Sequence, residues 1–173
     1  MFEARAILAT LPARTVFETT LTESKRRMAR SIIAVIVSYV LMFVLVSLSF
    51  FAMYSVLGAD QSFKPRSWDA SNQWLAIALV VSFVIAVIAG FVCALIARGG
   101  KAPLVLAIVV FALGFVFAVP SFVANRTDQG VRDYAPPLVE ALQKAKQPNW
   151  VPLALPVIGA VGVFIGGKLK KRN

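Results

Sequence analysis

The sequence contains no histidine and a single cysteine, Cys93, among its 173 residues. Histidine is the usual acid–base group and metal ligand at neutral pH, and one cysteine cannot close a disulfide within a chain. Charged residues are also scarce, at 15% of the chain. These absences argue against most enzyme classes, so we expect no catalytic residue, no metal site and no cofactor.

Apolar residues are abundant instead: 59% of the chain is hydrophobic and the mean hydropathy is +0.79. A transmembrane helix needs about 20 apolar residues, with about 17 as the lower limit. The chain has four long runs without a charged side chain, at residues 31–57, 74–97, 102–123 and 151–167. We therefore predict an all-α membrane protein, with an extension over residues 1–30 and a four-transmembrane-helix bundle over residues 31–173.

The basic residues indicate how these spans are oriented. Twelve of the 18 Lys and Arg residues, but only three of the eight Asp and Glu residues, lie before the first span, between the second and third, or after the fourth. The remaining loops, 58–73 and 124–150, are nearly balanced in charge. This is the positive-inside pattern, which predicts cytoplasmic termini. Together with the short loops, it indicates a bacterial inner membrane.

The formal charge of +10 therefore records topology, and we expect no nucleic-acid partner. Basic side chains near the inner membrane surface attract anionic lipid headgroups, at about 1 kcal/mol each. The predicted lipid contacts are Lys25, Arg26, Arg27, Arg30, Lys168, Lys170, Lys171 and Arg172.

Five aromatic residues lie near the outer ends of the predicted spans, where amphipathic rings favour the headgroup layer. These predicted interfacial anchors are Trp68, Trp74, Trp150, Tyr54 and Tyr134.

Two segments outside the spans carry weaker patterns. In residues 1–30, apolar residues recur at near-helical spacing around Pro12, which fits amphipathic helical pieces on the membrane surface. A basic topogenic cluster behind a disordered tail fits equally well. In the 124–150 loop we predict a short helix capped by Asp133, with Pro136 and Pro137 in its first turn. Its apolar strip is Leu138, Leu142 and Ala145.

Small residues repeat at four-residue intervals in three spans. Such residues let helix backbones approach closely in a membrane, where lipid provides no hydrophobic drive for association. We expect them to pack the bundle internally, with contact between chains as the alternative. They are Ala86, Gly90 and Ala94 in the second span, Gly114 and Ala118 in the third, and Gly159, Gly162 and Gly166 in the fourth.

No Asp, Glu, Lys, Arg or His lies inside a span, which argues against ion-coupled transport. The hydroxyl of Tyr39, in the middle of the first span, needs a partner there, and we expect a structural hydrogen bond in preference to a quinone or pigment contact. We therefore expect a non-catalytic accessory or structural subunit that packs against lipid and other membrane subunits or copies of itself. The alternative is a homo-oligomeric channel or facilitator for a small or apolar solute.

The orientation can be tested with reporter fusions in the 124–150 loop. We expect a periplasmic reporter at this position to be active, because the charge pattern places the loop outside. A fusion in the short hairpin at residues 98–101 is the control and should give the opposite signal. A cytoplasmic location for the 124–150 loop would contradict this topology.

Overall fold

The computed structural model describes residues 13–98, 101–124, 130 and 133–170. Within these residues the chain is helical, with two isolated β-bridges and no extended strand. The helices are α2 (Ala13–Ser62), α3 (Asn72–Ala97), α4 (Ala102–Ala124), α5 (Leu138–Lys144) and α6 (Val151–Leu169). All but α5 are long and apolar enough to cross a membrane. The structure therefore confirms the all-helical class with four candidate spans.

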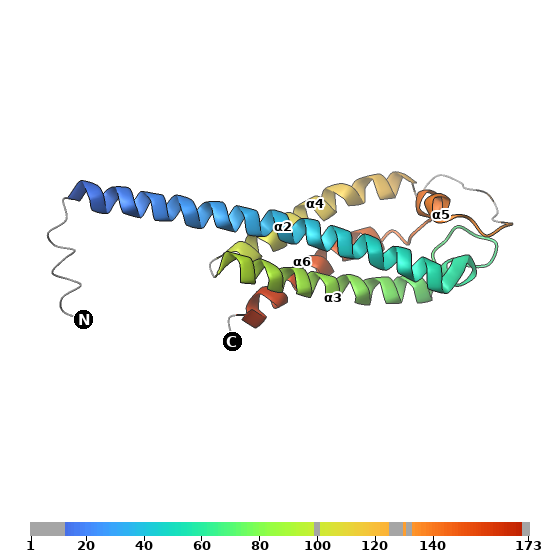
Figure 1. The fold of residues 1–173 in the computed structure, drawn as a ribbon. Coiled ribbons are helices and arrows are strands. Elements are labelled where there is room, and N and C mark those ends of the chain that lie inside the picture. Colours follow the sequence, from blue (N-terminus) through green and yellow to red (C-terminus); the bar gives the residue numbers. More distant parts are fainter. Residues whose placement is uncertain (1–12, 99–100, 125–129, 131–132, 171–173) are drawn as a thin grey trace.

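Helix α2 is the longest element, with 50 residues. At a rise of 1.5 Å per residue it extends about 75 Å, more than twice the roughly 30 Å of a hydrocarbon core. Its N-terminal part projects well beyond the other helices (Figure 1). Residues 13–30, which the sequence assigns to a separate extension, thus continue the helix of the first span from Ala13 onward.

The far end of α2 is bent at Gly58, whose φ of 69° and ψ of 178° lie outside the helical region. A residue with a side chain rarely adopts a positive φ, so glycine permits this bend. Beyond it the chain makes one more turn, in which the Ser62 hydroxyl donates to the carbonyl oxygen of Gly58 at 2.6 Å. The chain then turns towards α3, whose first turn is capped by Ser71: its Oγ accepts from the Trp74 amide at 3.1 Å.

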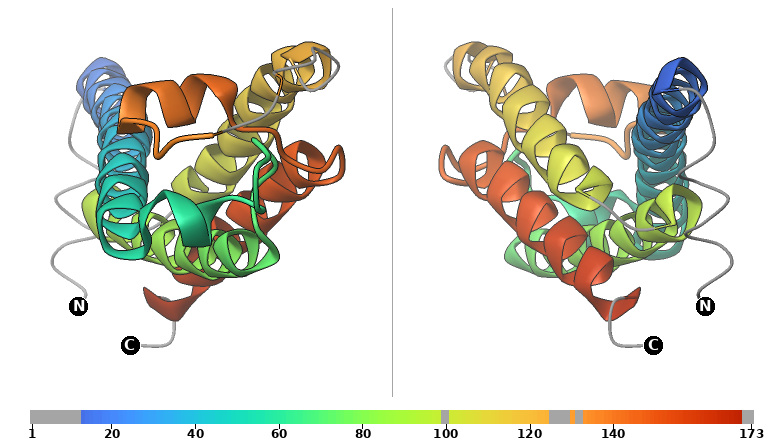
Figure 2. Two further views of the ribbon diagram at one scale, coloured as in Figure 1. Left: turned by 90° about the vertical axis from the view of Figure 1, so that its right-hand side faces the viewer. Right: turned by 90° about the vertical axis from the view of Figure 1, so that its left-hand side faces the viewer.

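The long helices follow the order α2, α3, α6 and α4 around the bundle, as Figure 2 shows in a view along its axis. Helix α3 packs most extensively against α6, α4 packs mainly against α6, and α2 packs mainly against α3. The backbones of α2 and α6 do not pack against each other. The pair α3 and α6 therefore forms the centre of the bundle, with α2 and α4 on its flanks.

Glycines on both helices bring α3 and α6 into backbone contact. A Cβ atom on Gly90 of α3 would lie 2.1 Å from the carbonyl oxygen of Val163, and one on Gly166 of α6 would lie 2.0 Å from that of Val87. No real Cβ atom fits at such distances, so each glycine accepts the backbone of the opposite helix. Val163, between the two contacts, is fully buried.

We expect Gly90→Ala and Gly166→Ala each to destabilise the protein by about 1–3 kcal/mol, because the added methyl group forces the two backbones apart. The measurement is thermal unfolding in detergent, followed by circular dichroism. Val161→Ile is the matched control: it adds one carbon on the exposed face of α6 and should leave the unfolding temperature unchanged. Unfolding temperatures for the alanine variants equal to that of the wild type would contradict the observed backbone contact.

Candidate functional site

Two loop segments close one end of the bundle, which we call the loop end, formed by residues 58–71 and 133–150. Two backbone hydrogen bonds join the segments: the Ala70 amide donates to the Lys146 carbonyl oxygen, and the Lys146 amide donates to that of Trp68, each at 2.8 Å. Because these bonds connect the start of α3 to the segment before α6, they fix the two central helices at this end.

Trp68 is the core of the loop end. Its side chain is only 3% exposed. Its ring centroid lies 6.0 Å from that of Phe63 and 6.5 Å from that of Tyr134, and the ammonium of Lys144 lies 5.0 Å above it. The ring of Trp68 is therefore enclosed by protein, whereas an interfacial anchor is expected to expose its ring.

The other predicted anchors occupy different environments. Trp150, immediately before α6, is 54% exposed, and Tyr134 is also exposed. Trp74 is partly buried and packs edge-on against Tyr54, with ring centroids 6.4 Å apart. The Tyr54 hydroxyl donates to the carbonyl oxygen of Pro136 at 2.6 Å, so it ties α2 to the segment before α5.

The predicted cap of α5 is wrong. The N-cap residue is Pro137, and no side chain caps the helix. The carboxylate of Asp133 instead accepts from the Arg66 guanidinium at 3.3 Å. Both side chains are largely exposed, so this pair contributes little stability. The sequence does not reveal the pair, because 67 positions separate its members.

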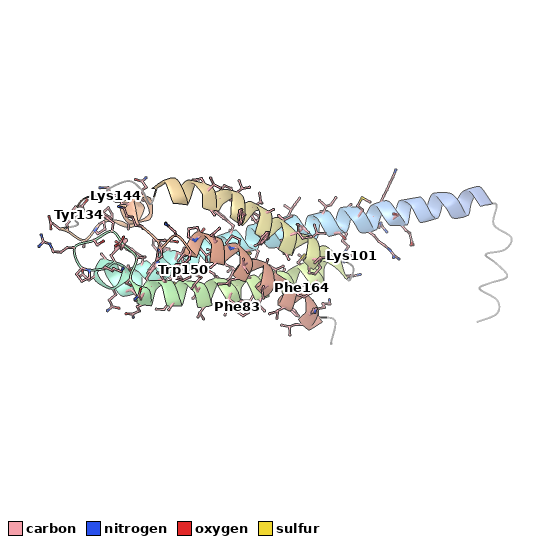
Figure 3. The ribbon with its side chains drawn as sticks, turned by 180° about the vertical axis from the view of Figure 1, so that it is seen from behind. Phe83, Lys101, Tyr134, Lys144, Trp150 and Phe164 are labelled. Carbon is pink, nitrogen blue, oxygen red and sulfur yellow. The ribbon has the colours of Figure 1, made fainter. Side chains whose placement is uncertain are left out.

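Three side chains on and before α5 form one network, and Figure 3 shows two of them, Tyr134 and Lys144, together at the loop end. Glu140 accepts hydrogen bonds from the Tyr134 hydroxyl and from the Lys144 ammonium, the latter at 2.8 Å. The bond from Lys144 lowers the pKa of Glu140, while the bonds to Glu140 raise the pKa values of Tyr134 and Lys144. At neutral pH the network therefore holds a charged Lys144 over Trp68.

The opposite end of the bundle, which we call the basic end, contains the predicted lipid-contacting residues that the structure describes. Arg30 is partly buried, and its Nε donates to the carbonyl oxygen of Ile96 at 2.8 Å, which connects α2 to the last turn of α3. Lys25 and Arg26 are exposed, and Arg27 pairs with Glu23 at 3.8 Å. The Lys168 ammonium lies over the ring of Phe164, and Lys170 is half-buried. Lys171 and Arg172 lie outside the described residues.

All eight predicted packing residues lie within described helices, and their contacts are internal. Gly162 faces Ala86, where an added Cβ would lie 2.7 Å from the alanine Cβ. Gly114 faces Pro156, and Gly159 faces Val110. Ala94 and Ala118 are buried, as are the α6 glycines. The α6 glycine face is thus in contact with α3 and α4.

An apolar cavity of about 370 Å³, partly open to the surroundings, lies between the four long helices. Helix α2 lines the cavity with Tyr39, Met42, Val46 and Phe50, and α3 lines it with Ser82. Helices α4 and α6 contribute mainly aliphatic and aromatic side chains, and Gln147 lies at the loop end. The cavity exists because α2 and α6 do not pack directly: Met42 reaches across, with its methyl carbon 3.8 Å from the Cβ position of Gly159. No side chain that is charged at neutral pH lines it.

Comparison with protein-family models, with curated proteins and with solved structures finds no match to this chain. The site is therefore defined by its own geometry. Of the features above, the sequence identifies Tyr39 as a polar residue inside a span and the small residues as positions of close helix packing. It gives no signal for the burial of Trp68, the Arg30 bond to α3 or the cavity, because each depends on residues far apart in the chain.

Replacing Trp68 and Trp150 separately tests which tryptophan supports the fold. We expect Trp68→Ala to cost about 3–5 kcal/mol, because it empties a buried aromatic site. We expect Trp150→Ala to change the stability by about 0.5 kcal/mol, because that ring is exposed. Thermal unfolding in detergent measures both. An equal loss for the two variants would contradict this assignment.

Proposed function

We propose that the protein is a non-catalytic accessory or structural subunit of a bacterial inner membrane, which packs against partner helices and lipid in a membrane complex. The supporting observation is the packing of α2. Only 11% of its most apolar 18-residue segment is buried, against 28% to 44% of the corresponding segments in the other spans. Most of its membrane surface is therefore available to neighbours outside this chain.

The free face of α2 is continuous and apolar. Its exposed large residues are Ile32, Ile33, Ile36, Val37, Val40, Phe43, Val44, Leu48, Phe51 and Val56. They extend over about 36 Å at 1.5 Å per residue, enough to cross the roughly 30 Å of a hydrocarbon core. A face of this length can pack along a whole helix of a partner, whereas α3 and α6 already use much of their surface on each other.

The basic end supports the orientation within this proposal. Lys25, Arg26, Arg27 and Arg30 lie on α2 where it leaves the bundle, close in sequence to the span. In the proposed topology both termini are cytoplasmic, and these side chains contact anionic headgroups where α2 leaves the bilayer on that face. The loop end, including the short α5 helix, then lies on the outer side.

The proposal predicts that α2 contacts a different protein. A photo-cross-linking amino acid at Phe43, which is 67% exposed, should produce a cross-link to a foreign subunit in cells. The same amino acid at Val161 is the control, because that position is also exposed but lies on α6.

Cross-links from Phe43 to one foreign protein, absent from Val161, support the accessory role. Cross-links only between copies of this chain, with solute flux in liposomes, would instead support a homo-oligomeric facilitator. The absence of any protein cross-link from Phe43 would contradict both readings and leave α2 facing lipid alone.

A further inference from the structure

We propose that the cavity between the four helices binds a lipid-soluble molecule that has a hydrocarbon tail and a carbonyl-bearing head. The first observation is its shape. Along α2 the lining extends from Tyr39 to Phe50, which corresponds to about 16 Å at 1.5 Å per residue. An elongated apolar space of about 370 Å³ is within the range of small-molecule sites and suits one chain.

The second observation is that two hydroxyl groups of the lining lack partners. Neither the Tyr39 nor the Ser82 hydroxyl makes a hydrogen bond to any described residue. Ser47 and Ser55 on α2 behave differently, because each donates to the carbonyl oxygen four residues earlier, at 2.9 Å. Tyr39 and Ser82 are both half-buried, so each retains a donor beside apolar side chains, where an unpaired polar group is costly.

A carbonyl oxygen is the ligand group that satisfies such donors. Tyrosine and serine hydroxyls donate to a carbonyl oxygen without a change of charge, and the lining offers no ionised group to bind a charged head. This selects an uncharged carbonyl compound over a free anion or cation. The structural hydrogen bond expected for Tyr39 from the sequence is thereby replaced by a bond to a ligand.

Two membrane sources supply this chemistry: a quinone with an alkyl tail, and a protonated long-chain fatty acid. Both provide a carbonyl oxygen on a flexible hydrocarbon chain. They differ in head size and in the number of oxygens, so their relative affinities distinguish them.

The test is native mass spectrometry of the full-length protein in detergent, titrated with decyl-benzoquinone, palmitic acid or dodecane. We expect one oxygenated probe to bind at a stoichiometry of one and dodecane to bind at least about tenfold more weakly, because it cannot accept a hydrogen bond. Preference for the quinone or for the fatty acid identifies the source, and either preference supports the proposal. Equal retention of dodecane would overturn it.

Two hydroxyl variants and one control test the residues. Tyr39→Phe and Ser82→Ala remove a hydroxyl without enlarging a side chain, and each should weaken the preferred probe about fivefold while leaving dodecane unchanged. Ser47→Ala is the matched control, because its hydroxyl already bonds within α2 and the residue is not part of the lining. Unchanged binding in both hydroxyl variants would overturn the proposed recognition.

Val46→Trp should fill the cavity and abolish binding, whereas Val44→Trp, two residues away on the exposed face of α2, should not. Equal binding by these two variants would place the probe outside the cavity and overturn the proposal. If Val46→Trp does not fold, the hydroxyl variants still decide the question, because they preserve the shape of the protein.

Discussion

The backbone contact between α3 and α6 is the constraint on which the rest of the structure depends. Gly90 accepts the backbone at Val163, and Gly166 accepts the backbone at Val87. Lipid tails are as apolar as the side chains, so helices in a membrane gain little from hiding apolar surface and associate through close packing. Glycine on both partners makes that packing as close as the backbone allows. The other two spans arrange themselves around this pair.

The position of α2 follows from this central pair. The glycines of α6 mainly contact α3 and α4, so α6 does not present a glycine face to α2. Helix α2 therefore packs mainly against α3. The part of α2 that lies within the bundle is nevertheless held near both of its ends, by Arg30 at Ile96 and by Tyr54 at Pro136. A helix held at its ends but separated from α6 along its middle leaves the apolar cavity on one side and a free surface on the other.

The loop end shows where local sequence patterns were insufficient. Trp68 lies next to a span, which is the usual place of an interfacial anchor, yet Phe63, Tyr134 and Lys144 enclose it. Asp133 precedes a helix, which is the usual place of a cap, yet it pairs with Arg66. In both cases a contact from a distant loop replaced the local interaction, because two loops meet over the bundle at this end.

The sequence by itself determined the class of the protein and its four candidate spans, because span length and the lack of internal charge are properties of continuous segments. It also indicated which residues are small enough for close packing. Only the tertiary structure decided that Gly90 meets Val163, that Trp68 is buried, and that Tyr39 and Ser82 line one cavity. These features depend on the rotation and relative height of separate helices, and those are set by contacts between residues far apart in the chain.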